Sequence, residues 1–311
     1  MTAPRTTSVS VRVPAKINLQ LSVGKLEDDG YHQVATVFHA VSLFDEVTVT
    51  PTDSDDIVVT LEGDTVEGVP TDESNLAVRA ARLLAERAGV RGGADLLLHR
   101  AIPVAGGMAG GSADAAATLV ACDAAWHTCL PRGDLMALAA ELGADVSFAL
   151  MGGTAVGTGR GEQLTPALAR GQHHWVLAFS GDGLSTPEVY AEFDRLTAGR
   201  VSPEPRVSDG LMQALRRGDG VALGAALRND LQPAACSLRA GLSDLVDVGL
   251  EYGAIGGVVS GSGPTVAFLV RDHEHALDLS VALTASGACE QVKRVHGPVH
   301  GARVADPSRP W

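Results

Sequence analysis

The sequence has little of what a membrane protein or a nucleic-acid-binding protein would need. No apolar run approaches the roughly 18 residues of a transmembrane helix, and the opening MTAPRTTS lacks the apolar core of a signal peptide. Positive charge is scarce, since 24 Lys and Arg stand against 37 Asp and Glu for a net charge of -13. This balance argues against nucleic acid or an anionic membrane as a partner, but it does not exclude an anionic small molecule. We therefore expect a cytoplasmic protein.

Patterns that would bind a metal or form disulfides are equally sparse. The four cysteines are scattered without C-x-x-C spacing, so neither zinc nor a disulfide framework is predicted. Cys122 and Cys129 stand one heptad apart near the end of a predicted helix, where we expect buried thiols. The paired histidines have no carboxylate at metal-ligand spacing and are expected at the surface; they are His173, His174, His273 and His275.

The length of 311 residues and a hydrophobic content of 45% predict a soluble globular protein with two domains or one large one. Alternating segments predict strands at 9–13, 19–23, 34–50, 57–61, 94–98, 174–179, 254–260, 265–270 and 291–295. Helical patterns occur at 75–90, 115–126, 131–142, 186–193, 211–217, 221–228, 238–252 and 275–286. The order of elements in the second half favours an α+β sandwich with helices on one face. Residues 1–8 and 198–206 are expected to be frayed or mobile.

The most distinctive stretch is PVAGGMAGGSADAAA at residues 103–117. Its four glycines open directly onto an alanine-rich helix, for which Ser112 would be a good N-cap. Bare backbone N–H groups at a helix N-terminus form an anion site, and nucleotide phosphates are the natural ligand. The stretch lacks the lysine of a Walker A loop and the glycine spacing of a dinucleotide fingerprint. The alternative is an ordinary flexible turn before a helix.

Two charged residues far from this loop are further candidates. Lys16 is one of only three lysines, and by the two-residue period of a strand it shares a side with Asn18. Asp145 is a lone carboxylate among small and apolar residues. The plainer alternatives are a solvated strand-end lysine and a helix N-cap aspartate.

The glycine-rich stretch resembles the nucleotide-binding motif of the GHMP kinase superfamily. Residues 14–19 (PAKINL) and 260–265 (SGSGPT) match the other two motifs of that superfamily, so the resemblance spans almost the whole chain. It implies a two-domain α+β fold. Residues 1–165 would form an N-terminal ATP-binding domain, and residues 166–311 would form a C-terminal substrate-binding α/β sandwich with an antiparallel sheet.

Three features narrow the resemblance within the superfamily. PAKINL, DGYH at residues 29–32 and GADV at residues 143–146 look like the branch that phosphorylates 4-(cytidine 5'-diphospho)-2-C-methyl-D-erythritol on its 2-hydroxyl, in the non-mevalonate route to isoprenoids. The resemblance implies ATP as the phosphoryl donor, with Mg²⁺ expected. Both ligands are small molecules, and the protein would be a monomer or a weak homodimer.

The resemblance also implies roles for individual residues. Lys16 and Asp145 match the catalytic pair. The positions that match the ATP site are Asn75, Arg100, Pro103, Val104, Ala105, Gly106, Gly107, Met108, Ala109, Gly110, Gly111, Ser112, Ala113 and Asp114. Those that match the substrate site are Asn18, Tyr31, His32, Phe38, Thr186, Tyr190, Gly261 and Ser262. Within the second set, Tyr31 and Tyr190 would sandwich the cytosine and His32 would read its edge. Ala109 stands where glycine is common and is expected to keep a negative φ.

Phosphoryl transfer asks a protein mainly for positioning and charge stabilisation. Lys16 is expected to favour an ionised Asp145, which would accept the proton of the substrate hydroxyl or only orient that hydroxyl. Two other functions stay open at this point. A relative that acts on another alcohol, such as homoserine or mevalonate, would lack a cytosine site. A non-catalytic binding protein would need neither charged residue.

Overall fold

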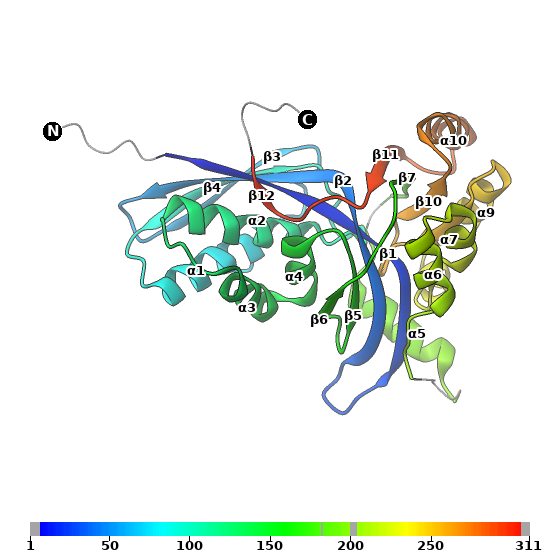
Figure 1. The fold of residues 1–311 in the computed structure, drawn as a ribbon, viewed down its shortest axis with the longest axis horizontal. Coiled ribbons are helices and arrows are strands. Elements are labelled where there is room, and N and C mark those ends of the chain that lie inside the picture. The colour runs from blue at the N-terminus through cyan, green and yellow to red at the C-terminus, as the bar shows by residue number, and fades with distance from the viewer. Residues whose placement is uncertain (1–6, 182, 200–203, 306–311) are drawn as a thin grey trace.

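The computed structural model describes residues 7–181, 183–199 and 204–305. The segments 1–8 and 198–206, which were expected to lack regular structure, lie partly outside these ranges. Two β-sheets organise the described chain, one with eight strands and one with four. Figure 1 shows the larger sheet with helices α1, α2 and α3 on one side of the molecule and the smaller sheet with helices α6 to α10 on the other.

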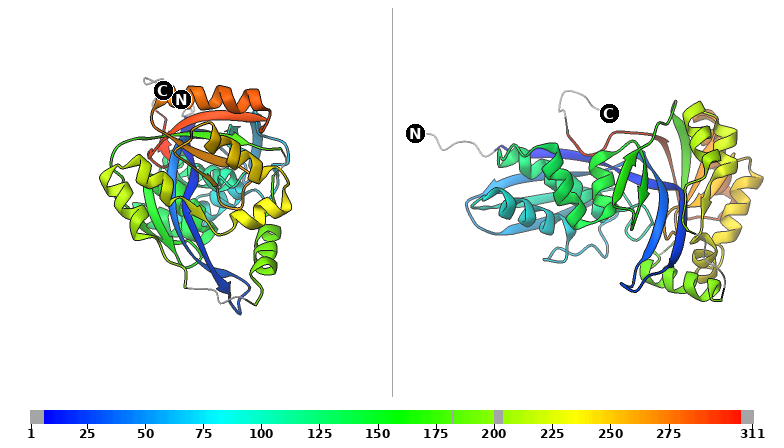
Figure 2. Two further views of the ribbon diagram at one scale, coloured as in Figure 1. Left: turned by 90° about the vertical axis from the view of Figure 1, so that its right-hand side faces the viewer. Right: turned by 60° about the horizontal axis from the view of Figure 1, so that its bottom comes forward.

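A long curved hairpin connects the two halves. It consists of β1 (Val9–Leu26) and β2 (His32–Thr52), which pair in antiparallel fashion and run through the middle of the molecule (Figures 1 and 2). The sequence predicted two separate strands at 9–13 and 19–23. The chain instead forms one strand, because register shifts at Pro14/Ala15 and Asn18/Gln20 absorb the proline and bend the ribbon. The stretch that carries Lys16 is therefore part of the sheet.

The larger sheet has the strand order β12-β1-β2-β4-β3, with β5 on β2, β6 on β5 and β8 on β1. Its further strands are β3 (Ile57–Gly63), β4 (Gly93–Arg100), β5 (Thr154–Thr158), β6 (Gln163–Pro166), β8 (Arg228–Asn229) and β12 (Arg303–Val304). The helices packed on it are α1 (Leu76–Ala88), α2 (Gly110–Ala125) and α4 (Ala144–Met151), and α3 (Arg132–Leu142) packs against these three helices. Helix α2 is buried along most of its length, and its alanines allow the sheet and the neighbouring helices to approach closely.

The smaller sheet is antiparallel throughout, in the order β11-β7-β10-β9. Its strands are β7 (His173–Phe179), β9 (Gly256–Val259), β10 (Val266–Val270) and β11 (Gln291–Gly297). The helices of this half are α5 (Thr186–Thr197), α6 (Asp209–Arg217), α7 (Gly220–Ala226), α8 (Gln232–Leu238), α9 (Leu242–Glu251) and α10 (His273–Ser286). The boundary at 165/166 stays a prediction, and β12 carries the chain back to the first sheet.

Several local expectations were wrong. Helices were expected on one face of the smaller sheet, but successive residues of β7 point into two cores. Trp175 and Leu177 share one with α6 and α7, while Val176 and Ala178 share the other with α9 and α10. The helix predicted at 238–252 is present as α9, but it begins only at Leu242, after Gly241 at φ 88°, and the preceding helix α8 was not predicted. Cys122 is buried as expected. Cys129 is exposed, because α2 has already ended at Ala125.

Within the described ranges, none of the helices combines the length and the apolar character that a bilayer crossing requires. The same residues contain no cluster of three or more histidine, cysteine or acidic side chains arranged to bind a metal ion.

Two histidines lie buried where the two sheets meet, although one of them, His173, was expected at the surface. The ring of His39, on β2, is 5.8 Å from that of His173 and 6.0 Å from that of Trp175. Its Nδ1 lies 2.8 Å from Thr154 Oγ1, and its Nε2 has no hydrogen-bond partner among the described residues. Burial, reinforced by repulsion from His173, lowers the pKa of His39 to about 3. Both rings are therefore neutral in the folded protein near neutral pH.

The free energy of unfolding should fall as the pH drops from about 6.5 towards 3, because the unfolded chain protonates His39 and the folded chain does not. At pH 5 the loss from this residue should be roughly 2 kcal/mol. Urea unfolding of the wild type and of His39→Gln at pH 7 and pH 5 measures it, with the exposed His99→Gln as control. An equal pH effect in the wild type and His39→Gln would contradict this role of His39.

Candidate active site

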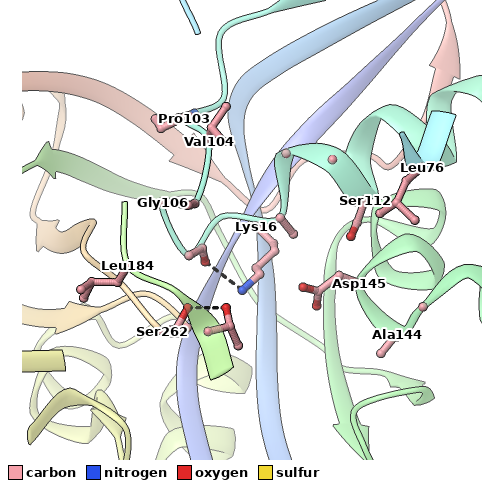
Figure 3. A pocket seen from close by; sticks show the side chains of 18 of the residues that line it. Lys16, Leu76, Pro103, Val104, Gly106, Ser112, Ala144, Asp145, Leu184 and Ser262 are labelled. Carbon is pink, nitrogen blue, oxygen red and sulfur yellow. Dashed lines mark hydrogen bonds between the residues drawn. The ribbon is translucent and has the colours of Figure 1, made fainter. Parts of the chain in front are cut away.

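A cleft of about 840 Å³ lies where the two halves meet. Its walls come from segments that are distant in sequence, among them strand β1, the glycine-rich loop before α2, the start of α4 and the turn between β9 and β10. Figure 3 shows the side chains of Lys16, Ser112 and Asp145 directed into this space from three different elements. The cleft is large enough for a nucleotide and a second small molecule.

The glycine-rich loop presents a helix N-terminus to the cleft. Helix α2 begins at Gly110, so the N–H groups of Gly110, Gly111 and Ser112 have no acceptor within the helix and are available to an anion. Ser112 was expected as the N-cap but is the third helical residue. The capping position belongs to Ala109, whose φ is 62° and not negative as expected. This conformation is costly for a residue with a Cβ, so the loop is held in a strained shape.

Lys16 is buried, and its ammonium group is fixed by two hydrogen bonds. Its Nζ donates to Asn18 Oδ1 at 2.7 Å and to the carbonyl of Gly107 at 2.9 Å. The Asn18 amide is itself oriented, because its Nδ2 donates to Thr36 Oγ1 at 2.8 Å. Lys16 has three N–H donors and uses two of them in these contacts, which leaves one for a ligand in the cleft. The Phe38 ring centroid is 5.9 Å from the ammonium group.

Asp145 lies across the cleft, and Figure 3 shows its carboxylate turned towards Lys16. Gly143 precedes α4 with φ 152° and ψ 158°, a conformation that favours glycine, and this turn places Asp145 in the first turn of the helix. Asp145 is thus not the N-cap. Burial lowers the pKa of Lys16, and the charge of Asp145 opposes that shift. The structure therefore brings the two residues together.

The two glycine turns are docked onto each other beside Lys16. The Gly107 carbonyl accepts a hydrogen bond from Ser260 Oγ at 2.9 Å in addition to the one from Lys16. Asn229 holds the second turn, since its Nδ2 donates to the carbonyls of Val259 at 2.8 Å and Gly261 at 2.7 Å. The phosphate-facing loop of one half is thereby tied to the other half of the molecule.

The predicted ATP residues occupy three kinds of position. The loop residues 103–107 and 109–112 line the cleft, as do Asn75, Arg100 and Asp114. Asn75 also caps α1, because its Oδ1 accepts from the N–H of Ala77, while its Nδ2 donates to the Pro70 carbonyl. Met108 and Ala113 are not brought to the cleft, because their side chains are buried in the core.

At the other end of the cleft, Tyr190 lines the wall, and His32 packs against it without being one of the residues that line the cleft, although it was predicted as a substrate residue. Their rings are 5.0 Å apart, and His32 Nε2 is 2.8 Å from Asp194 Oδ1, which leaves Nδ1 for another partner. Burial and the nearby charge of Asp145 raise the pKa of Tyr190 to about 12. Thr186 Oγ1 and Ser262 Oγ are 2.9 Å apart, a contact visible in Figure 3. Together with Gly261, these hydroxyls form part of the wall opposite α4.

Tyr31 is not part of this wall. It is 57% exposed, and the Arg160 guanidinium lies over its ring, 4.0 Å from the centroid. Arg160 is itself paired with Asp29 and also lines the cleft. Of the two tyrosines predicted to sandwich the cytosine, only Tyr190 therefore lines the cleft.

Comparison with known proteins agrees with this architecture. The family model described as GHMP kinases N terminal domain matches residues 75–153, and the model described as GHMP kinases C terminal matches residues 211–289. A 4-diphosphocytidyl-2-C-methyl-D-erythritol kinase of Thermobifida fusca is 56% identical over 310 residues, covering 98% of this chain and all of the relative. The kinase of the same name from Mycolicibacterium smegmatis is 54% identical over 96% of this chain and 93% of its own.

The chain belongs to the GHMP kinase family, among the 4-diphosphocytidyl-2-C-methyl-D-erythritol kinases.

Solved structures support the same assignment. A crystal structure of 4-(cytidine 5'-diphospho)-2C-methyl-D-erythritol kinase superimposes with a TM-score of 0.74 at 34% identity, covering 92% of this chain and 98% of that one. A homoserine kinase from Cytophaga hutchinsonii gives 0.76 at 19% identity, covering 98% of this chain and 99% of that one. The second likeness shows the shared fold alone. The fold is therefore common to GHMP kinases with different acceptors, and the acceptor is determined by the lining of the cleft.

Sequence reasoning missed several residues of this GHMP kinase site. Asp45, Asp194 and Asn229 are buried or half-buried polar side chains that fix cleft residues, and nothing in their local sequence distinguishes them from surface residues. Arg160 could have been noticed, because it follows a strand-and-turn segment rich in glycine. No feature of the sequence predicted that the segment 68–70 lines the cleft beside Asn75.

Replacing Gly107 by alanine should destabilise the docking of the two glycine turns. A Cβ at this position would lie 2.0 Å from the Ser260 carbonyl oxygen, and φ is already +74°. We expect a loss of about 2 kcal/mol or more in the free energy of unfolding and impaired ATP binding. Gly133→Ala is the matched control, because Gly133 lies in helix α3 with open space around its Cβ position and should be neutral or slightly stabilising. Equal thermal stability of the two variants would refute the docking.

Proposed function

We propose that this protein transfers the γ-phosphoryl group of ATP to the 2-hydroxyl of 4-(cytidine 5'-diphospho)-2-C-methyl-D-erythritol. The observation that carries the proposal is the cleft in which Lys16 and Asp145 face a helix N-terminus whose N–H groups are free. Relatives 52–56% identical over almost the whole chain are named as kinases of this substrate.

The residues support transfer by positioning and by charge. The N–H groups of Gly110, Gly111 and Ser112 would bind the β- and γ-phosphates, and the Lys16 ammonium would neutralise charge on the transferring group. Asp145, on the opposite wall, would accept the proton of the acceptor hydroxyl. Because the Gly107 carbonyl holds the Lys16 ammonium, the charge is fixed relative to the loop that binds the phosphates.

Oxygen ligands for Mg²⁺ are available at the same place. Magnesium bound with ATP keeps several waters and needs only one or two protein oxygens. The Asp145 carboxylate and the Ser112 hydroxyl line the cleft beside the phosphate-binding N–H groups and fit this requirement. The ion would offset charge on the β- and γ-phosphates.

The cytosine end of the substrate would lie between Tyr190 and His32 on one side and the Arg160 end of the cleft on the other. Tyr190 offers a ring face, and His32 offers Nδ1 to the base edge while Asp194 holds Nε2. Tyr31 would complete the stack only if the Arg160 guanidinium leaves its ring. That guanidinium could then contact the diphosphate of the substrate.

Replacing Asp145 by asparagine should lower kcat by two to four orders of magnitude, because the amide cannot take the hydroxyl proton. The affinity for ATP in the absence of Mg²⁺ should change little, because Asp145 would contact the nucleotide only through the ion. A coupled kinase assay with the cytidyl substrate measures the effect. Asp134→Asn is the control, since Asp134 also lies in the first turn of a helix but is exposed and outside the cleft. Turnover of Asp145→Asn within tenfold of the wild type would remove Asp145 from the proton transfer.

The three tyrosines of the chain allow a matched test of cytosine recognition. Tyr190→Ala and Tyr31→Ala should each raise the KM for the cytidyl substrate about tenfold, since base stacking contributes roughly 1–3 kcal/mol. Neither should change the KM for ATP. Tyr252→Ala, at an exposed position outside the cleft, should affect neither constant. Similar losses for both ligands would place the cytosine elsewhere.

In the same assay homoserine and mevalonate should not be phosphorylated. Preferential use of either alcohol would overturn the proposed substrate and leave the family assignment intact.

A further inference from the structure

A cluster of one arginine and two aspartates lies buried behind the phosphate-facing loop. Arg100, at the end of β4, is 3% exposed, while Asp45 on β2 and Asp114 on α2 are 0% and 2% exposed. Arg100 Nε is 3.3 Å from Asp114 Oδ2 and 3.6 Å from Asp45 Oδ2. A single guanidinium thus faces two carboxyl groups, which leaves one negative charge uncompensated if both are ionised.

A shared proton removes this excess charge. Asp45 Oδ2 and Asp114 Oδ1 have no hydrogen-bond donor among the described residues, and the same Arg100 Nε lies within 3.6 Å of a carboxyl oxygen of each aspartate. Burial raises the pKa of both, and the charge of Asp45 raises the pKa of Asp114 further. A proton on Asp114, donated to an ionised Asp45, would supply the missing donor and balance the single guanidinium.

The cluster contacts the loop at both of its ends. Asp45 Oδ1 accepts hydrogen bonds from the N–H groups of Ala101 at 2.6 Å and Ile102 at 2.8 Å, immediately before the loop begins. At the other end, a Cβ on Gly110 would lie 2.5 Å from Arg100 Nη2, so the guanidinium sits directly against the first residue of α2. Asp114 belongs to the second turn of the same helix.

We propose that Asp45, Arg100 and Asp114 form a proton-sharing triad that positions the phosphate-binding loop, with Asp45 as its anchoring residue. This rests on the proposed use of ATP. Asp45 fixes the chain entering the loop, and Arg100 supports the helix N-terminus from behind. The proton on Asp114 keeps the triad neutral, so that no excess negative charge lies beneath the site that receives the phosphates.

Other charged groups near α2 come from β1 and α4. Lys16 of β1 and Asp145 of α4 line the same cleft, but neither is among the groups that shift Asp45 or Asp114. Helices α1 and α3 turn apolar side chains towards α2. Within the described residues, Asp45, Arg100 and Asp114 therefore set the charge of this cluster among themselves.

The anchoring role of Asp45 is tested by the affinity for a non-hydrolysable ATP analogue, measured by calorimetry. Asp45→Ala leaves two buried N–H groups without an acceptor, and we expect its Kd to rise about tenfold or more. Asp45→Asn keeps an acceptor for Ala101 and Ile102 and offers an N–H to Asp114, so its Kd should return to within about threefold of the wild type. Asp123→Asn is the control, because Asp123 accepts from the Leu130 N–H at the opposite end of α2 and should leave the Kd unchanged.

The shared proton is tested by infrared spectroscopy at about pH 8, where exposed carboxyl groups are ionised. The wild type should show the C=O stretch of a protonated carboxyl group, and Asp114→Asn should lose this band because its side chain carries no such proton. Asp123→Asn should keep the band.

Absence of the protonated carboxyl band from the wild type, or its persistence in Asp114→Asn, would overturn the shared proton. An Asp45→Ala protein that binds the analogue as tightly as the wild type would overturn the anchoring role, and so would an equal loss in Asp45→Asn. If Asp45→Ala does not fold, failure of Asp45→Asn to restore folding would overturn the anchoring role, and the infrared measurement still decides the shared proton. Failure of the wild type to bind the analogue at all would instead overturn the proposed use of ATP, and the triad with it.

Discussion

The backbone carbonyl of Gly107 joins three elements that form the cleft. Gly107 accepts hydrogen bonds from the Lys16 ammonium and from the Ser260 hydroxyl, and so joins strand β1, the glycine-rich loop and the turn after β9. The three elements come from distant parts of the chain, and the loop and the turn have Gly107 and Ser260 at their contact, where backbone approaches backbone. Because Gly107 has no side chain, the loop and the turn approach each other more closely than a residue with a Cβ would allow.

The charges around the cleft follow a common rule. A charge taken out of water must be compensated by a partner or a hydrogen bond, and its cost rises steeply when the partner is removed. Lys16 is held between an amide and a carbonyl and faces Asp145, while Arg100 faces two carboxyl groups that share a proton. The net charge of -13 is thus no obstacle to a polyanionic ligand, because the local arrangement of cations and N–H groups decides what the cleft accepts.

The fold alone does not determine the acceptor. A homoserine kinase shares this architecture at 19% identity. At the far end of the cleft in this protein, Tyr190 lines the wall and packs against His32, whose ring is held by Asp194. The phosphate end and the acceptor end are built from different segments, which allows one to vary while the other keeps its geometry.

The sequence determined the parts of this protein that depend on local conformation. The glycine-rich stretch fixes an exposed helix N-terminus, the alternating pattern around Lys16 fixes which side chains share a face, and Gly143 makes the turn before Asp145. These are properties of adjacent residues, so they can be predicted from a single chain. Ser112 and Ala109 mark the limit even there, because α2 begins at Gly110, two residues before the residue with the best capping preference, and its N-cap is Ala109 at φ 62°.

Only the tertiary structure decided which distant residues meet. The local sequence did not predict the burial or the partners of Asp45, Asn229 and Asp194, because nothing in the residues beside them distinguishes a buried aspartate or asparagine from an exposed one. Tyr31 showed the converse, because a tyrosine expected in the cleft lies outside it beneath Arg160. The physical reason is that a polar side chain acquires its role from its burial and its partners, and both are set by the packing of segments that are far apart along the chain.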